Sequence, residues 1–87
     1  MTKIYIYCLF DKDDNFKSVY SSIKAVHRDA MKLCNQGTAA VIVEVNGVRS
    51  SPSLTLLRNV FKGETDIKVK YLSDQNQATI IKTKLRE

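Results

Sequence analysis

The chain has 87 residues, of which 44% are hydrophobic and 26% charged, with three glycines and one proline. This composition excludes disordered and fibrous classes and describes a single compact domain spanning residues 1–87. Lysine and arginine number 14 against nine acidic residues, so the formal net charge of +5 favours acidic or polyanionic partners such as nucleic acid.

No segment approaches the roughly 20 consecutive apolar residues that a membrane-spanning helix requires. The first ten residues, MTKIYIYCLF, lead into acidic residues without a signal-peptide cleavage pattern. Cys8 and Cys34 have no cysteine or histidine at ligand spacing, which is typical of reduced core thiols. We therefore expect a cytoplasmic protein with no membrane partner, bound metal or cofactor.

Residues 3–10, KIYIYCLF, are rich in β-branched and aromatic side chains and predict a first strand. The polar cluster DKDDN predicts a turn, after which residues 16–20, FKSVY, return as a second strand. The alternation of the first strand assigns Ile4, Ile6, Cys8 and Phe10 to one face and Lys3, Tyr5, Tyr7 and Leu9 to the other, more polar face.

Apolar residues then recur at three- and four-residue steps from Ile23 to Cys34, which predicts an amphipathic helix. Ser21 or Ser22 is expected to cap its start, and Gly37 to end it. The next segment, TAAVIVEV, is apolar at nearly every position and predicts a central, well-covered strand. A tight turn at Asn46 and Gly47 follows it.

Ser51 and Pro52 predict the start of a short second helix, which Gly63 ends. Two strands, at about 66–72 and 78–86, complete the chain around the turn SDQNQ. The order β-β-α-β-α-β-β predicts an α+β fold, a two-layer sandwich in which both helices cover one face of a mostly antiparallel sheet. The other sheet face is then open to solvent or to a partner.

If the last two strands pair around a five-residue turn, Leu72 faces residue 78 and Asp66 faces Lys84. Lys68 then lies opposite Lys82, with Lys70 diagonal to it, an arrangement of like charges that weakens a hairpin. One interpretation is that these lysines protect an exposed sheet edge from aggregation. The alternative, which we favour, is a face that binds phosphate groups.

A second basic series, Lys24, Arg28 and Lys32, is spaced at four-residue steps along the first predicted helix. Such residues form one ridge of about 12 Å at 1.5 Å per residue. Like charges four residues apart weaken a helix, so the ridge indicates either binding of polyanions or an ordinary solvated helix face.

Tyr5 and Tyr7 are neighbours on the more polar face of the first strand, beside Lys3. Aromatic rings beside cations on an open sheet stack the bases of single-stranded RNA in several protein folds. The two tyrosines are also good strand formers that would cover neighbouring strands or a dimer interface.

Nothing in the sequence indicates an enzyme. His27 is the sole histidine, and its acid-base partner would have to be an aspartate from the first turn or from its own helix. No glycine-rich phosphate loop or nucleophile motif is present in the sequence.

Residues 10–37, FDKDDNFKSVYSSIKAVHRDAMKLCNQG, place a hairpin with an acidic turn before a basic helix. This arrangement resembles the small accessory proteins that large tailed bacteriophages make early in infection. The size and basic balance are similar to those of phage inhibitors of the RNA-processing ToxIN toxin–antitoxin system. The resemblance implies RNA binding and inhibition of a host toxin ribonuclease.

We therefore expect a non-enzymatic RNA-binding protein that counters a host toxin. We also expect a homodimer, because one small core gains stability from association and because Leu72 and Ile80 lie among the cations of the last hairpin. The alternative is a protein-binding inhibitor of a host nucleic-acid-processing enzyme that does not itself bind RNA. The expected RNA-binding residues are Tyr5, Tyr7, Lys24, Arg28, Lys32, Lys68, Lys70, Lys82 and Lys84.

Overall fold

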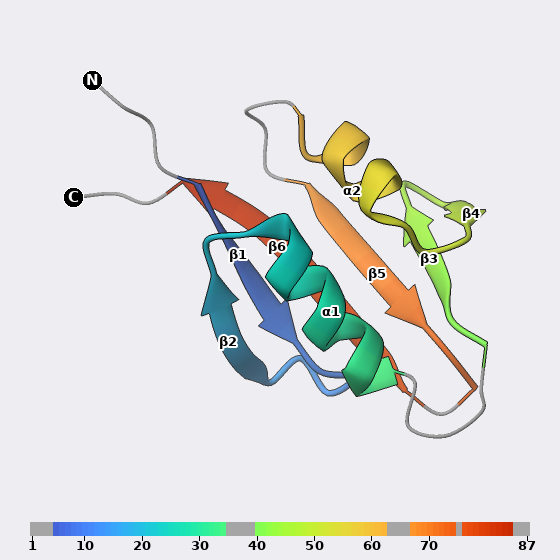
Figure 1. The fold of residues 1–87 in the computed structure, drawn as a ribbon. Coiled ribbons are helices and arrows are strands. Elements are labelled where there is room, and N and C mark those ends of the chain that lie inside the picture. Colours follow the sequence, from blue (N-terminus) through green and yellow to red (C-terminus); the bar gives the residue numbers. More distant parts are fainter. Residues whose placement is uncertain (1–4, 35–39, 63–66, 75, 85–87) are drawn as a thin grey trace.

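A computed structural model describes residues 5–34, 40–62, 67–74 and 76–84 (Figure 1). In chain order, the elements within these ranges are β1 (Tyr5–Phe10), β2 (Phe16–Tyr20), α1 (Ile23–Cys34), β3 (Ile42–Val45), β4 (Val48–Ser50), α2 (Leu54–Val60), β5 (Lys68–Leu72) and β6 (Gln77–Lys84).

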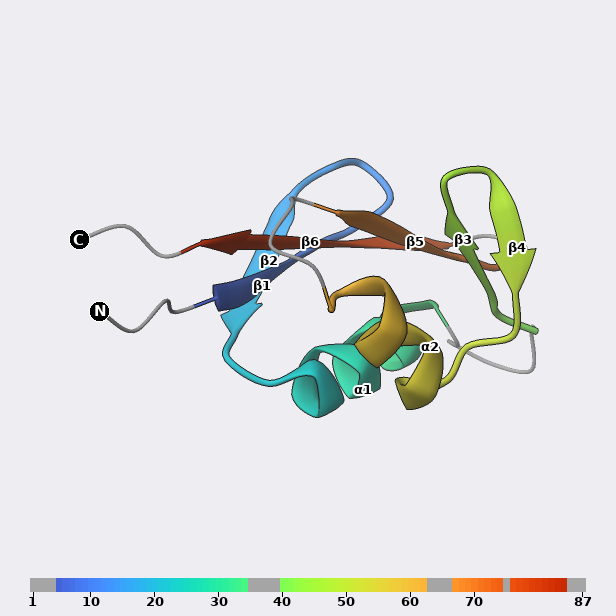
Figure 2. The same ribbon diagram turned by 90° about the horizontal axis from the view of Figure 1, so that it is seen from above.

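The strands of the described ranges form one six-stranded sheet in the order β2-β1-β6-β5-β3-β4, with each neighbouring pair antiparallel. Both helices lie on the same side of this sheet, as the view from above shows (Figure 2). The predicted α+β class and two-layer arrangement are thus confirmed. One face of the sheet is covered by helices, and we call the other the open face.

The structure adds one strand to the predicted order. After Asn46 and Gly47, which have φ angles of 53° and 83°, the chain returns along β3 as the three-residue strand β4. Two consecutive positive φ angles are typical of the tight hairpin turn expected here. The prediction that the apolar segment before this turn is central was wrong, because β3 lies next to the edge and β6 takes a central position.

Serine side chains cap both helices. The Ser22 hydroxyl accepts a hydrogen bond from the Ala25 amide at 3.1 Å, which confirms one of the two expected caps of α1. At α2 the cap is Ser53 rather than Ser51, because the Ser53 hydroxyl reaches the Leu56 amide at 3.0 Å. The expected helix ends at Gly37 and Gly63 lie outside the described residues.

The core lies between the helices and the covered face of the sheet. Val26, Ala30 and Cys34 of α1 are fully buried, as are Tyr71 of β5 and Ile80 of β6. The Cys34 thiol donates to the Tyr71 carbonyl at 3.3 Å, and burial raises the pKa of that thiol to about 11. Cys34 is therefore a protonated core residue, as expected from the sequence, and α1 is fixed over β6 and β5.

Candidate nucleic-acid interface

The register of the last hairpin determines where its lysines lie. Leu72 pairs with Gln77, so the connecting loop has one residue fewer than predicted and Lys68 pairs with Ile81 rather than Lys82. The loop is closed by Ser73, whose amide donates to the Asn76 carbonyl at 3.0 Å. The Ser73 hydroxyl also donates to the Cys34 carbonyl at the end of α1, at 3.0 Å. This contact with a distant element fixes the shorter loop.

A shift of one residue moves every side chain of a strand to the opposite face. Lys68 and Lys70 lie on the open face, whereas the register places Lys82 and Lys84 on the face that carries the helices. The expectation that one face collects all four lysines was therefore wrong. Asp66, the predicted partner of Lys84, lies outside the described residues.

Lys82 is 6% exposed, although its position was predicted on the surface. Its ammonium donates a hydrogen bond to the backbone carbonyl of Phe61 and lies 4.3 Å from the centre of the Tyr5 ring. A buried cation with these contacts stabilises the packing of α2 on the sheet and has no access to a nucleic-acid phosphate. The prediction that Lys82 binds RNA was therefore wrong.

The two tyrosines of β1 also lie on the covered face. Tyr7 is buried against Phe61, with ring centres 5.2 Å apart, and burial raises the pKa of its hydroxyl. Tyr5 is half-buried beneath Lys82. Base stacking by this pair on an open sheet was a wrong prediction. The two tyrosines are covered because Tyr7 lies on the same face of β1 as Leu9, which packs into the core.

The basic series on α1 is where the sequence predicted it. Lys24, Arg28 and Lys32 are all exposed, and they form the ridge that their four-residue spacing requires. We call these three residues the α1 ridge. Neither Lys24 nor Lys32 forms an ion pair with another described residue.

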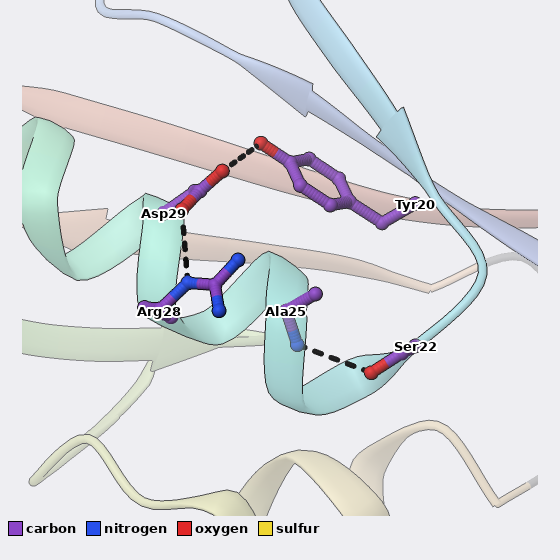
Figure 3. Close-up of polar contacts among 5 residues, drawn as sticks. All are labelled: Tyr20, Ser22, Ala25, Arg28 and Asp29. Carbon is purple, nitrogen blue, oxygen red and sulfur yellow. Dashed lines mark hydrogen bonds and ion pairs between the residues drawn. The ribbon is translucent and has the colours of Figure 1, made fainter.

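The acidic neighbour of the α1 ridge is Asp29, which is bound toward the sheet (Figure 3). The Tyr20 hydroxyl donates to one Asp29 oxygen at 2.6 Å, and Arg28 Nε donates to the other at 3.3 Å. The Tyr20 hydrogen bond lowers the pKa of the Asp29 carboxyl, which therefore stays ionised at neutral pH. Asp29 offsets part of the Arg28 charge and leaves the ridge positive.

An open groove runs between α1 and the first hairpin. It is lined by two lysines, Lys17 from β2 and Lys32 from the α1 ridge, together with Tyr20 and Asp29. Lys17 is the extra residue of a bulge, because Leu9 pairs with Ser18 while Phe10 pairs with Phe16. Lys17 was not among the expected RNA-binding residues, since nothing in FKSVY indicates a bulge.

The open face carries two rows of side chains that cross the sheet. The first row joins neighbouring strands through the pairs Phe16–Phe10, Phe10–Thr79, Thr79–Lys70, Lys70–Glu44 and Glu44–Arg49. The second row joins Val19, Cys8, Ile81 and Lys68 in the same way. Each row begins with an exposed apolar side chain on β2 and reaches a lysine on β5.

Among the described residues, Phe10 and Phe16 are the aromatic side chains of the open face, and neither was among the expected RNA-binding residues. Their ring centres lie 5.8 Å apart in an edge-to-face arrangement, and Phe16 is 58% exposed. The alternation of residues along β1 could have identified Phe10, because it places Phe10 on the face opposite Tyr5 and Tyr7. Of the two apolar residues expected on the basic face, Leu72 lies there, whereas Ile80 is fully buried under the helices.

His27 does not contact any of the aspartates considered as its partners. Its Nδ1 atom lies 2.6 Å from the hydroxyl of Tyr71, which is fully buried. Burial lowers the pKa of His27. The Asp11 carboxylate instead accepts the amides of Asp13 and Asn15, both at 2.9 Å, and organises its own turn.

Within the described ranges, neither helix is long and apolar enough to cross a membrane. Comparison with protein-family models, curated proteins and solved structures finds no match to this chain.

Proposed function

We propose that this protein is a non-enzymatic RNA-binding protein of the cytoplasm. The α1 ridge is the observation that carries the proposal. Lys24, Arg28 and Lys32 are exposed on successive turns although like charges at this spacing weaken a helix by roughly 0.2 to 0.5 kcal/mol per pair. A polyanion lying along the helix would relieve that repulsion.

The surroundings of the α1 ridge support binding of an extended anion. Lys17 adds a fourth cation across the groove, and the Ser18 and Tyr20 side chains line the same groove. The Tyr20 hydroxyl of β2 holds one Asp29 oxygen toward the sheet, and the other oxygen pairs with Arg28. Contacts of this kind bind the RNA backbone and depend little on base sequence.

The resemblance of residues 10–37 to early phage accessory proteins supports a more specific role. We propose that RNA binding serves to inhibit a host toxin ribonuclease, in the manner of TifA, the phage inhibitor of the ToxIN system. In that role the partners are RNA and the toxin, and the site of action is the host cytoplasm.

The test compares two triple variants with the same change in charge. Changing Lys24, Arg28 and Lys32 to Gln should weaken binding to a short RNA and lower the slope of log affinity against log salt by up to about three units. The control changes Lys12, Arg58 and Lys62, exposed cations outside α1, to Gln. Fluorescence anisotropy across a salt series measures both.

Equal losses in the two triple variants would show that only net charge matters and would contradict a site on α1. If the native protein binds no RNA near physiological salt but still inhibits a toxin ribonuclease, the alternative of a purely protein-binding inhibitor is correct.

A further inference from the structure

The open face exposes apolar side chains that the fold itself does not use. Phe16, Val19 and Ile42 are 58%, 49% and 41% exposed, and the register places all three on this face. Phe16 and Val19 lie together on the edge strand β2, whereas Ile42 lies on β3, four strands across the sheet. An exposed apolar patch on a small domain, such as that on β2, commonly marks a binding site. The charges of the face indicate which kind of partner would suit it.

Charge on the open face is positive. Arg49 and Glu44 form an ion pair at 3.3 Å and largely offset each other. Lys68 and Lys70 remain, and neither takes part in an ion pair with a described residue. A second copy of the chain would bring the same two cations to the interface, which opposes face-to-face association. A partner that complements this face carries negative charge for the two lysines and flat apolar groups for the exposed aromatic side chains.

The aromatic and the basic side chains of the open face lie on different strands, and we call these two parallel zones the aromatic lane and the basic lane. Phe10 and Phe16 occupy β1 and β2, while both lysines occupy β5, two strands from Phe10. Strands lie about 4.8 Å apart, so the backbone positions of Phe10 and Lys70 are separated by roughly 10 Å. Lys68 and Lys70 follow one another at about 6.7 Å along the strand. An extended nucleic-acid strand has the same two lanes, with bases on one side and phosphates on the other.

We propose that the open face binds single-stranded RNA, with nucleobases stacked on Phe10 and Phe16 and phosphates bound by Lys68 and Lys70. This inference rests on the proposed function and names its substrate class. A duplex is excluded from the site because its paired and stacked bases present no free ring face to Phe16. Thr79, which lies between Phe10 and Lys70, is only 3% exposed and is not one of the proposed RNA contacts.

The experiment uses oligouridine and a blunt RNA duplex of equal length as probes. Phe16→Ala should weaken oligouridine binding roughly 5- to 100-fold, the effect of losing one stacked base, and leave duplex binding unchanged. Val48→Ala is the matched control, because Val48 is 65% exposed on β4, where its pairing with Val45 places it on the helix side. The control should leave both affinities unchanged.

Two further measurements test the assignment of each lane. Changing Lys68 and Lys70 to Gln should lower the salt slope for oligouridine by up to about two units. In NMR spectra, oligouridine should shift the ring signals of Phe10 and Phe16, and the duplex should leave them in place.

The binding of the two probes by the native protein and by Phe16→Ala distinguishes a wrong stacking site from a wrong assignment of RNA binding. If the native protein binds neither probe, RNA binding itself is wrong. If it binds both probes equally and Phe16→Ala changes neither affinity, RNA binding stands and the stacking platform is overturned. If Phe16→Ala reduces the sedimenting mass but not RNA affinity, the open face joins two copies of the chain, and the proposal is likewise overturned.

Discussion

The Lys82 ammonium lies beyond the last turn of α2, where helical carbonyl groups lack partners within the helix. It donates to the Phe61 carbonyl and packs over the Tyr5 ring, so one side chain links β6 to α2 and to β1. A cation at a helix C-terminus also interacts favourably with the helix dipole. Lys82 therefore acts through packing and hydrogen bonding, unlike the exposed lysines of the same hairpin.

We predict that Lys82→Ala destabilises the protein by about 1 to 3 kcal/mol, because the buried Phe61 carbonyl loses its donor and the lysine stem leaves a gap. Lys68→Ala, at an exposed position of the neighbouring strand, should change stability by no more than about 0.5 kcal/mol. Urea denaturation measures both. Equal stability of the two variants would contradict the role assigned to Lys82.

At the scale of elements, α1 is attached to the sheet at its C-terminal end and near its middle. Near its end, the Cys34 carbonyl accepts from Ser73 in the β5–β6 loop. Near its middle, Asp29 accepts the Tyr20 hydroxyl from the edge strand β2 (Figure 3). The second contact fixes the distance between α1 and the first hairpin, and with it the groove that brings Lys17 near Lys32.

Tyr20→Phe should therefore destabilise the protein by about 1 kcal/mol and raise the pKa of Asp29 toward its ordinary value. The control is Tyr5→Phe, because the Tyr5 hydroxyl makes no hydrogen bond with a described residue. Denaturation and an NMR titration of the Asp29 carboxyl check the two effects. An unchanged pKa in Tyr20→Phe would show that Tyr20 does not hold Asp29.

The sequence predicted the helices and the longer strands because their apolar residues repeat at clear periods. It did not predict β4, since the three residues Val48–Ser50 are too few for alternation to be seen. The register of the last hairpin depends on Ser73 reaching Cys34, a contact between residues 39 positions apart that no local pattern records. Lys82 and Lys84 were misplaced for that reason.

The face of β1 was misjudged for a different reason. Ile6, Cys8 and Phe10 are more apolar than Tyr5, Tyr7 and Leu9, so alternation favoured the set that the structure leaves on the open face. The helices decide which set is covered, by packing Phe61 against Tyr7. The ridge on α1 was correctly placed because the buried stripe of Val26, Ala30 and Cys34 defines the opposite surface.

At the scale of the whole molecule, overall stability should respond to acid through His27. Burial lowers the pKa of His27 in the folded protein below the ordinary value of about 6.5. The unfolded chain therefore takes up a proton at a higher pH than the folded protein does. Stability is greatest above the unfolded pKa and falls as the pH drops toward the folded pKa.

We predict that the free energy of unfolding decreases between about pH 7.5 and pH 5.5 and that His27→Gln reduces this slope. Asp11 and Asp29 have lowered pKa values and titrate at lower pH, so they do not contribute to the change in stability over this pH range. Urea denaturation at several pH values provides the test. A slope that is the same in both proteins would assign the acid sensitivity to other groups.

The central place of β6 determines how this sheet is assembled. Within the described residues, β2 and β1 form one half of the sheet, β5, β3 and β4 form the other, and β6 joins them. Yet β6 follows all the other strands in the chain, and Tyr5 at one end pairs with Lys84 at the other. On the ribosome, β1 and β5 therefore have unpaired edges until residues 77–84 emerge. Folding must wait for that segment, and a nascent chain held before it exposes two strand edges to chaperones and to other nascent chains.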